Sequence, residues 1–486
     1  CGAACSCDTA ECGTCAPTTS TGGDGGAGGG TPIGCIPSEA DGPVADSCGV
    51  FVSSSLGDDG NAGTKDAPFA TIGAALAVAG ARPVYACAEA FDEAVSITSG
   101  VSLYGGLDCA NQWSYVGAAT KTDLTAPADS IVLRVEPGAD GTVVADFAIA
   151  ARDAVADGAS SIAVLVDQAE VTFEGCELVA GNGADGAEGI TPSGGDLDGE
   201  TGKNGSDSSP ACQNSVNAGG SGGEKICAGS NVDGGIGGAG TSTSVGGSGD
   251  PGLGTDPGDL GVGEGTAGQC TGGDGGDGVR GAPGSGAAGT GQLVSAGYVG
   301  IEGEPGQGPG TPGSGGGGGG GAHECAAPND AYAGPSGGGG GSGGCGGQAG
   351  GGGQAGGASI ALAVVDGAVT LTACTLAAGN GAVGGTGSPG QPGGSGGGGG
   401  QRGAHPQTYA CDGGVGGAGG RGGAGGGGLG GHSLGIAYTG TAPVTDAGTS
   451  ITVGTSGPGG AGGDGGTNNQ GGNGAAGTAA ETLSFD

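Results

Sequence analysis

Glycine that recurs with a period of three is the feature that most constrains this chain. The stretch 413–426 holds two glycines for every other residue, and 459–466 continues the pattern. Three residues per turn is the repeat of an extended left-handed helix, which has no internal hydrogen bonds. Two of its three edges here lack a Cβ, so neighbouring backbones can approach and bond to one another. The pattern predicts polyglycine-II-like helices packed side by side.

Glycine supplies 138 of the 486 residues and aromatic residues only 3%, so a conventional core over the whole chain is not available. A flexible linker is the alternative interpretation of such tracts. Three features favour ordered helices instead. Cysteines interrupt the tracts, the filler residues are often Ala or single polar residues, and both long tracts leave and return at equivalent points of a repeated segment.

A formal net charge of −38 excludes whole classes of partner. Nucleic acid binding requires Lys and Arg to neutralise phosphates, and only 10 such residues face 48 acidic ones. Anionic membrane surfaces are disfavoured for the same reason. This charge keeps an exported protein soluble and can attract divalent cations, of which Ca²⁺ is the candidate.

The 17 cysteines indicate export to an oxidising compartment. The single CxxC pair, Cys12 and Cys15, has no second pair or His at the spacing of a zinc site. With Cys1 set apart, sixteen cysteines remain as candidates for eight disulfides, whose pairing the spacing leaves open. They are Cys5, Cys7, Cys12, Cys15, Cys35, Cys48, Cys87, Cys109, Cys176, Cys212, Cys227, Cys270, Cys325, Cys345, Cys374 and Cys411.

Cys1 is followed by Gly2 and Ala3, and the chain contains no Met. A small residue after an N-terminal Cys is typical of a bacterial lipoprotein from which the signal peptide has been removed. We therefore expect either a lipid on Cys1 or a link from Cys1 to another subunit. No apolar run approaches the roughly 20 residues that span a bilayer, so membrane contact is expected only through that lipid.

Residues 49–183 predict a stack of short strands. Apolar runs such as 83–87, 95–97 and 131–135 are separated by Gly, Asn and Asp, which is typical of all-β folds. One short amphipathic helix is expected over Pro68–Ala77, where Phe69, Ile72 and Leu76 follow helical spacing.

The stretches Val50–Ser53, Asp58–Thr64 and Pro68–Ile72 resemble the N-terminal cap of right-handed parallel β-helix proteins of the pectate-lyase-like superfamily. Val84–Cys87 and Leu103–Cys109 are also similar to that family. Many of its members are exported proteins from myxobacteria and relatives. The resemblance covers about a third of the chain and implies a right-handed parallel β-helix, without a specific activity.

An internal repeat at a constant offset of 198 residues supports stacked coils: Ser161–Ala163 recurs as Ser359–Ala361, and Ala180–Gly183 as Ala378–Gly381. A looser third copy runs from Ser433 to Val453. The predicted organisation has six parts: a Cys-rich arm (1–48), a β-helix cap with the first coils (49–183), a glycine-rich insertion (184–358), a coil repeat (359–381), a second insertion (382–432), and a last coil with a glycine-rich end (433–486).

Signals for catalysis and metal binding are weak. Of the ten basic residues, only Arg134, near Glu136, sits in a predicted strand beside acidic residues. The three histidines, His323, His405 and His432, lie in or beside glycine tracts. His323 precedes Cys325 by two residues, which allows a zinc ligand if the thiol is reduced. The stretches 272–278 and 462–466 are similar to Ca²⁺-binding nonapeptides but lack the required apolar residue, so we expect their Asp side chains to face solvent.

These features predict a non-enzymatic extracellular protein of the bacterial outer surface, with no cofactor. Its expected role is structural or adhesive, with self-association into a homo-oligomer or a filament and contact with surface polysaccharide. Two alternatives remain. A carbohydrate-binding or carbohydrate-active module would use Tyr104, Trp113 and Tyr115, the only aromatic cluster. An ice-binding protein would use flat arrays of glycine helices.

Overall fold

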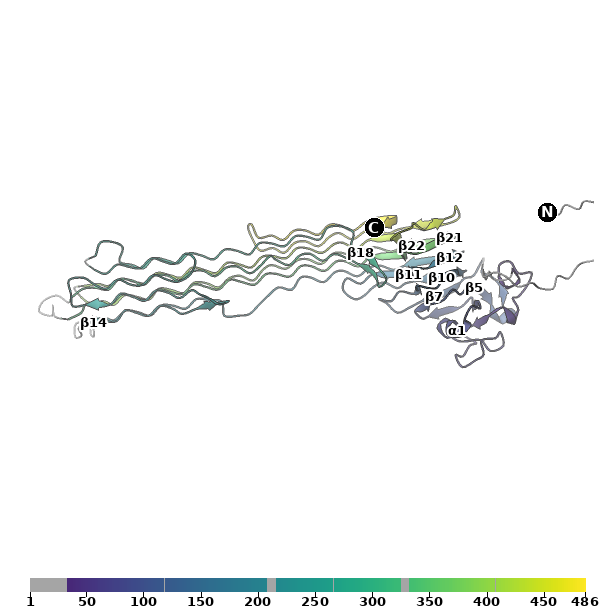
Figure 1. The fold of residues 1–486 in the computed structure, drawn as a ribbon, viewed down its shortest axis with the longest axis horizontal. Helices are drawn as coiled ribbons and strands as arrows, with labels where there is room; N and C mark the ends of the chain where they lie inside the picture. Colours follow the sequence, from purple (N-terminus) through teal and green to yellow (C-terminus); the bar gives the residue numbers. More distant parts are fainter. Residues whose placement is uncertain (1–32, 118, 208–215, 265, 325–331, 407) are drawn as a thin grey trace, which may run out of the picture.

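In the computed structural model the described residues are 33–117, 119–207, 216–264, 266–324, 332–406 and 408–486. The fold has two parts. Sheets of short strands stack at one side, and long extended glycine-rich segments project from them as a bundle, hereafter the glycine bundle (Figure 1). Most of the predicted arm, 1–48, lies outside the described residues.

Three sheets form the stack, and apart from the short β6 all of their strands pair in parallel. The first contains β1 (Val50–Val52), β2 (Val84–Cys87), β5 (Leu103–Asp108), β6 (Ser114–Tyr115), β9 (Thr142–Ala145), β12 (Glu170–Glu174), β21 (Ala368–Thr372) and β24 (Val444–Thr445). The second contains β3 (Ala90–Asp92), β7 (Thr122–Thr125), β10 (Phe147–Ala150), β13 (Glu177–Ala180), β22 (Thr375–Ala378) and β25 (Ser450–Thr452). The third contains β4 (Val95–Ile97), β8 (Leu133–Val135), β11 (Ser161–Asp167), β20 (Ser359–Val365), β23 (Ser433–Tyr438) and β26 (Ala479–Ser484).

The repeat found in the sequence is a register of neighbouring strands. Ser161 of β11 pairs with Ser359 of β20, which pairs with Ser433 of β23. Each repeat places one strand in each sheet, so like residues stack on like residues. The predicted all-β class with parallel sheets is confirmed, whereas right-handed winding and the superfamily stay predictions.

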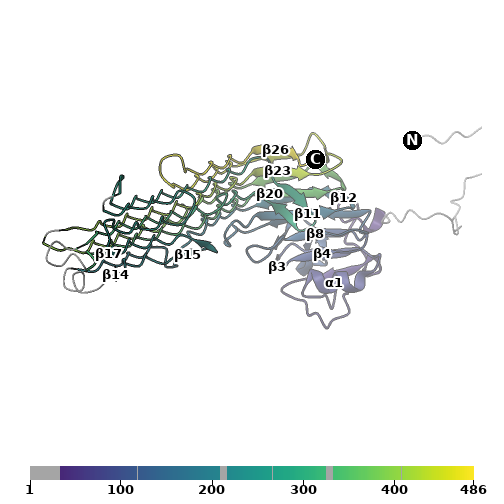
Figure 2. The same ribbon diagram turned by 60° about the vertical axis from the view of Figure 1, so that its left-hand side comes forward.

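The predicted helix is observed as α1 (Ile72–Ala79), which begins four residues later than expected. Phe69 instead forms a parallel bridge with Val52, and Thr71 caps the helix by accepting the N–H of Ala74. The helix buries Ile72, Ala75 and Ala79 against the first strands. It therefore covers the end of the stack that β1 begins (Figure 2). Three short 3-10 turns complete the helical elements of the described residues: η1 (Ile33–Cys35), η2 (Asp46–Cys48) and η3 (Cys109–Asn111).

Strands β11 and β20 are buried on both faces, which explains their unbroken apolar runs. Their inner side chains join the main core. Their outer side chains pack under an antiparallel hairpin of β18 (Gln292–Val294) and β19 (Gly297–Val299), through Leu293 and Tyr298. The predicted insertion 184–358 is therefore not all glycine helix, because an apolar hairpin within it returns to cover the stack.

The glycine bundle leaves the stack at three equivalent points. The chain departs after β13, β22 and β25 of the second sheet and returns at β20, β23 and β26 of the third. The long insertion doubles back within the bundle, where short antiparallel pairs form: β14 (Val216–Asn217) with β17 (Gly240–Thr241), and β15 (Ile226–Cys227) with β16 (Ser230–Asn231). Leaving and returning at one repeated position lets the segments lie side by side.

Hydrogen bonds between segments recur every third residue, as the predicted polyglycine-II-like packing requires. Segment 341–353 donates N–H groups to segment 414–426, with distances of 2.8–3.0 Å. The donors are Gly341, Gly344, Gly347, Gly350 and Gly353, and the acceptors are the carbonyls of Gly414, Gly417, Gly420, Gly423 and Gly426. Because an extended threefold helix has no internal bonds, these contacts satisfy its backbone.

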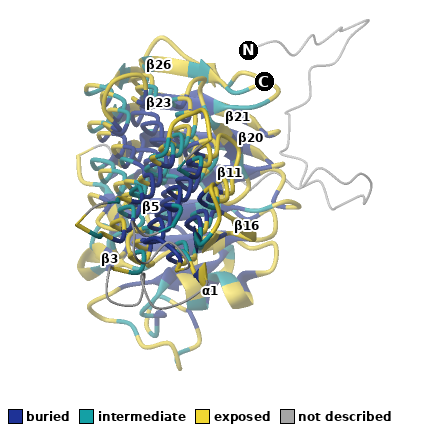
Figure 3. Cartoon of the chain, turned by 90° about the vertical axis from the view of Figure 1, so that its left-hand side faces the viewer, coloured by how far each residue is buried: buried dark blue, intermediate teal, exposed yellow. Residues whose placement is uncertain are grey.

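The run Gly315–Gly321 has neighbours on all three edges. A Cβ at each successive position would run into a backbone carbonyl of 411–414, 259–262 or 232–241, in rotation. Gly315, Gly318 and Gly321 face 232–241, Gly316 and Gly319 face 411–414, and Gly317 and Gly320 face 259–262. All seven residues are buried, and Figure 3 shows buried segments at the centre of the bundle when it is viewed end-on. A segment that is covered by neighbouring backbones on all three edges therefore requires glycine at every position.

Residues 413–417 have neighbours on two edges only. Gly413 and Gly414 each face a carbonyl of an adjacent segment, whereas Val415 is 47% exposed. Nearer the stack, segment 454–464 arrives and covers the third edge, and at Gly427 and Gly430 the third position becomes glycine. The number of glycines per triplet thus follows the number of neighbouring backbones.

Two adjacent glycines provide a matched test of this packing rule. A Cβ at Gly397 would clash with the carbonyl of Glu200, whereas a Cβ at Gly398 would meet only the Thr201 side chain at 3.6 Å. We expect Gly397→Ala to lower the free energy of unfolding by about 1–3 kcal/mol. Gly398→Ala should change it by less than about 0.5 kcal/mol or raise it slightly. Urea denaturation measures both, and equal losses would contradict the rule.

Candidate functional site

The far end of the glycine bundle, hereafter the tip, is the surface that the fold presents furthest from the stack (Figure 1). Its turns hold together through specific contacts: Asn217 donates to the carbonyls of Ala333 and Gly334, and Asp207 accepts the N–H of Ala404. Among the described residues of the tip, four large apolar or aromatic side chains are exposed: Val216, Val245, Tyr332 and Tyr409. These exposed side chains therefore lie at the end of a bundle whose segments are joined by backbone hydrogen bonds.

Asp and Asn side chains complete the hydrogen bonding of the bundle surface. A filler residue at a segment's exposed edge has no neighbouring carbonyl for its N–H, and a carboxylate or amide oxygen from an adjacent segment accepts it instead. Asp198 accepts from Ser395 at 2.8 Å, Asp274 from Val415 at 2.8 Å and Asn204 from Gln401 at 2.9 Å. Part of the acidity of this chain is thus structural.

Buried serines do the same inside the bundle. Ser336 and Ser342 are fully buried, and their hydroxyls accept the N–H groups of Ser206 and Glu200 at 2.7 Å. Sequence reasoning missed these roles. The signal was present as a single Ser in an otherwise glycine run, but its partner lies more than a hundred residues away.

The charge of Asp198 is tied to this role. Backbone and side-chain hydrogen bonds from Ser395 lower the pKa of Asp198, although the carboxylate itself lies in solvent. The ionised form is the better acceptor, so folding favours it. Stability from this carboxylate is therefore present above its unfolded pKa near 3.8 and lost as the pH falls through the lower folded value.

Eight of the predicted disulfide cysteines form four bridges: Cys35–Cys48, Cys87–Cys109, Cys227–Cys345 and Cys270–Cys411. The last two join parts of the glycine bundle that are 118 and 141 residues apart in sequence. Such bridges indicate a protein that matures outside the cytoplasm. Cys1, Cys5, Cys7, Cys12, Cys15, Cys212 and Cys325 lie outside the described residues.

Cys176 and Cys374 were expected to form disulfides, and the structure corrects this: both are free thiols. They are inward-facing core residues of neighbouring repeats and are buried. Each thiol donates to a carbonyl of the preceding repeat, Cys176 to Val144 at 3.3 Å and Cys374 to Phe173 at 3.4 Å. Burial raises the pKa of the Cys176 thiol. These cysteines serve as small apolar residues of the core.

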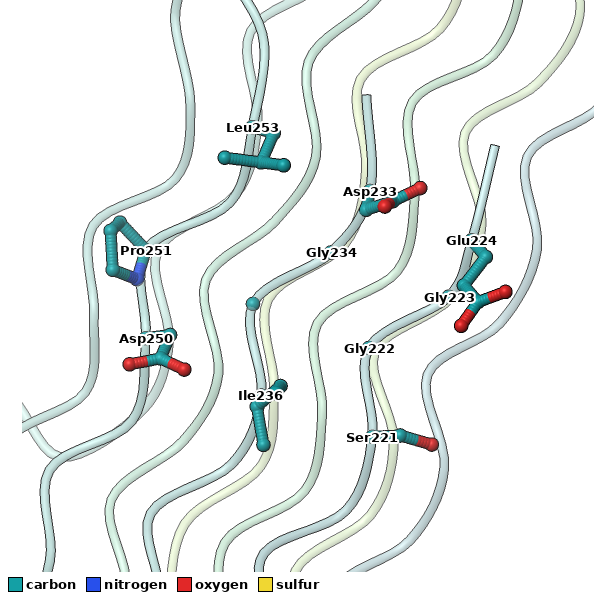
Figure 4. Close-up of a pocket in the computed structure, with 11 residues that line it drawn as sticks. Ser221, Gly222, Gly223, Glu224, Asp233, Gly234, Ile236, Asp250, Pro251 and Leu253 are labelled. Atoms are coloured by element: carbon teal, nitrogen blue, oxygen red, sulfur yellow. The ribbon is translucent and has the colours of Figure 1, made fainter. Parts of the chain in front are cut away.

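A shallow groove of about 430 Å³ runs along one face of the bundle, between residues 221–224, 233–236 and 250–253 (Figure 4). Its apolar lining comes from Ile236, Pro251 and Leu253, and its carboxylates from Glu224, Asp233 and Asp250. Asp233 accepts the N–H of Lys225, so this carboxylate has a structural partner. The groove lining contains no basic side chain and no thiol or imidazole.

A polar cluster that the sequence did not indicate joins three repeats of the stack. Asp146, which follows β9, accepts a hydrogen bond from the Tyr115 hydroxyl at 2.9 Å, and its Oδ1 lies 4.0 Å from Lys121 Nζ. Lys121 also donates to the carbonyl of Gly175. Burial raises the pKa of Asp146, and burial together with Asp146 raises that of Tyr115 to about 12. Because Asp146 is the partner of both Tyr115 and Lys121, and Lys121 also bonds to Gly175, the cluster links three successive repeats of the stack.

The proposed aromatic binding cluster is not available as a surface. Tyr104 and Trp113 are 5% and 3% exposed. Trp113 packs edge-on against Phe51, and Tyr104 stacks on Tyr85, whose hydroxyl donates to the carbonyl of Cys35 at 2.7 Å. These rings form a small core between the first sheet and the Cys35–Cys48 segment. Sequence order could not distinguish this second core from a ligand platform.

The remaining candidates also have structural partners. Arg134 does not pair with Glu136 but donates to the carbonyls of Ser295 and Ala296 in the turn of the β18–β19 hairpin. Asp274 and Asp277 cap backbone N–H groups of the adjacent segment, rather than simply facing solvent. Nowhere in the described ranges do three or more His, Cys, Asp or Glu side chains gather as metal ligands would.

The three predicted histidines are separated. His323 lies 2.9 Å from a Glu264 oxygen, and His405 lies in the tip turn that the Ala404–Tyr409 bridge closes. His432 is buried where the bundle meets the stack: its Nε2 lies 2.8 Å from the carbonyl of Thr290, and its Nδ1 accepts the N–H of Thr478. Burial lowers the pKa of His432, which keeps the neutral ring that both contacts need.

No family model matches this chain, and neither curated proteins nor solved structures show a match to it. Over the residues that the structure describes, none of the helices has the length and apolar character to span a bilayer.

Removing the Cys270–Cys411 bridge should loosen the bundle. A double Cys270→Ser, Cys411→Ser variant frees a loop of 141 residues, and we expect the free energy of unfolding to fall by about 2–5 kcal/mol. Amide exchange should accelerate in 259–262 and 411–414. Cys374→Ala, which alters a free core thiol, is the control, and its exchange changes should stay in the stack. Unchanged exchange in the first variant would contradict a clamping role for the bridge.

Acid should weaken the bundle through its caps. Unfolding midpoints of the wild type should hold constant above about pH 5 and fall below about pH 4. Asp198→Asn keeps an acceptor oxygen, as Asn204 does naturally, and should reduce the acid dependence at little cost at pH 7. Asp198→Ala should lower stability at pH 7. If Asn and Ala behave alike, the side-chain oxygen has no capping role.

Proposed function

We propose that this protein is a non-enzymatic structural or adhesive component of a bacterial outer surface. In this proposal the stack is a right-handed parallel β-helix of the pectate-lyase-like type. The glycine bundle is the working part: it holds the tip away from the stack and presents it to surface polysaccharide or to another cell.

One observation carries the proposal. The end of the bundle carries four exposed apolar or aromatic side chains, and the interior of the bundle is backbone packed on backbone. The four residues are Val216, Val245, Tyr332 and Tyr409. Exposed aromatic side chains are the kind that anchor contacts, because they bury much area with few rotatable bonds. The bundle itself supports a mechanical role, since two disulfides tie its segments together.

Of the two alternatives, the carbohydrate-binding one loses its predicted platform, because Tyr104 and Trp113 are buried. It returns in another form if the tip aromatics contact glycans. The ice-binding alternative has flat rows of glycine segments in its favour. The side chains that these rows expose to solvent include Asp274, Arg280 and Val415, which differ in size and charge and so do not form a regular surface.

The test is an adhesion assay with the oxidised full chain coupled to beads. Beads should be retained on immobilised outer-surface polysaccharide, and a Tyr332→Ala, Tyr409→Ala variant should lose most of that retention. Ile190→Ser, which changes a side chain that is 83% exposed and away from the tip, is the matched control.

Equal retention of the tip variant and the control would contradict a role for the tip. Soluble sugar fragments released from the polysaccharide would favour the carbohydrate-active alternative instead. Thermal hysteresis of the purified protein would favour ice binding.

A further inference from the structure

The shallow groove on one face of the glycine bundle lies between three neighbouring segments, 221–224, 233–236 and 250–253 (Figure 4). Glycine forms much of its lining, so a ligand in the groove can approach the backbone of these segments closely. The glycines are Gly222, Gly223, Gly234 and Gly235. None of the exposed tip side chains lines the groove, which makes it a separate surface.

Two carboxylates of the groove, those of Glu224 and Asp250, are exposed, and neither has a hydrogen bond or an ion pair within the described part of the chain. The third carboxylate, Asp233, accepts the N–H of Lys225 at 2.6 Å. The ammonium of Lys225 does not line the groove and lies 3.0 Å from Asp196. The groove therefore carries negative charge that no neighbouring cation compensates.

Apolar side chains lie beside these charges. Ile236 is 52% exposed and Leu253 is 46% exposed, and Pro251 completes the apolar lining. An exposed apolar surface with a polar rim is typical of a site that contacts another molecule. A ligand that matches this groove must therefore combine cationic groups with apolar ones.

The groove also contains a free backbone donor. On other faces of the bundle, the N–H of an exposed filler residue is accepted by an acidic or amide side chain, as Asp274 accepts that of Val415. Across the described ranges, the N–H of Ile236 has no acceptor of this kind and none from a backbone carbonyl. A ligand that carries carbonyl groups can satisfy this donor.

We propose that the groove binds a basic, apolar peptide segment of a partner protein in an extended conformation. Such a segment provides Lys or Arg for the carboxylates, aliphatic side chains for Ile236 and Leu253, and carbonyls for the free N–H. The stems of Lys and Arg also pack on apolar surface. A polyproline II peptide has the same period as the bundle segments, three residues per turn, so every third side chain can match Asp233 and Ile236.

Other occupants lack one of these complements. A polyamine has the charge but no carbonyl group, and nucleic acid is repelled by the carboxylates. A second copy of this chain has a net charge of −38, and its ten Lys and Arg residues are scattered singly along the sequence. None of the ten lies outside the described residues, so the undescribed segments of this sequence cannot supply the cations. The proposal does not depend on adhesion by the tip.

Fluorescence anisotropy with the oxidised full chain tests the proposal. The probe is a short labelled peptide of repeated Lys-Pro-Leu, a composition that favours the polyproline II conformation. We expect a Kd of about 10–100 μM at low salt, and weaker binding as salt is added. Peptides of repeated Glu-Pro-Leu and of repeated Lys-Pro-Ser each lack one complement and should bind at least about tenfold more weakly.

A double variant of the free carboxylates, Glu224→Gln with Asp250→Asn, should weaken binding of the Lys-Pro-Leu probe at least about tenfold and reduce its salt dependence. The matched control is Asp157→Asn with Glu188→Gln, which removes the same charge at two exposed positions outside the groove. The control should change the affinity by less than about twofold. Circular dichroism should show both variants folded.

Equal losses in the two charge variants would show that only the net charge attracts the peptide, and would overturn the proposal. Binding of the Lys-Pro-Ser repeat as tight as that of the probe would also overturn it, as would displacement of the probe by an equal concentration of spermine. Ile236→Ser should weaken binding at least about fivefold, whereas Ile190→Ser should not, and equal effects of these two would contradict apolar contact. None of these results bears on retention by the tip, so the two proposals fail separately.

Discussion

Close approach of glycine backbones is the contact on which the rest of this structure depends. An extended threefold segment has no hydrogen bonds of its own, so its N–H and C=O groups must find partners in neighbouring segments. Those partners are reachable only where no Cβ intervenes, as at Gly315–Gly321, where a methyl group at any position would meet a carbonyl. Hydrogen bonds between backbones therefore stabilise the glycine bundle, whereas burial of apolar side chains stabilises the stack.

Two consequences follow for the other residues. At bundle surfaces the third residue of a triplet is free to vary but its N–H has no carbonyl, and Asp or Asn from the next segment supplies the oxygen, as Asp274 does for Val415. Inside the bundle Ser336 and Ser342 do this with hydroxyls. The acidic residues, which the sequence suggests serve solubility, therefore also complete the hydrogen bonding of the bundle surface. Disulfides between distant segments hold the glycine segments in register.

Three features could be predicted from the sequence, because each rests on a local pattern: the period of the glycine tracts, the repeat at an offset of 198 and the short strands before Gly183. Export was readable from the cysteines. The pairing of the cysteines could not be predicted. Cys176 and Cys374 look like the other cysteines in sequence, and only their inward position in stacked repeats makes them core thiols. Trp113 and Tyr104 looked like a binding cluster for the same reason, since sequence order does not show which second layer covers an aromatic side chain. The β18–β19 hairpin lies inside a tract whose composition is uniformly glycine-rich. Its role as a cover of the stack depends on contacts of Tyr298 with His432 and Phe485, which are distant in sequence.

By itself the sequence determined which segments can pack backbone to backbone, because the absence of a Cβ is a property of the residue and its spacing. It also determined how many edges of each segment can be covered, through the number of glycines in a triplet. Only the tertiary structure decided which segments become neighbours, which acid caps which N–H, and that α1 covers the end of the stack where β1 lies. Many of these contacts join residues far apart in sequence, such as Asp274 and Val415, which are 141 positions apart, and no local pattern encodes a partner at that distance.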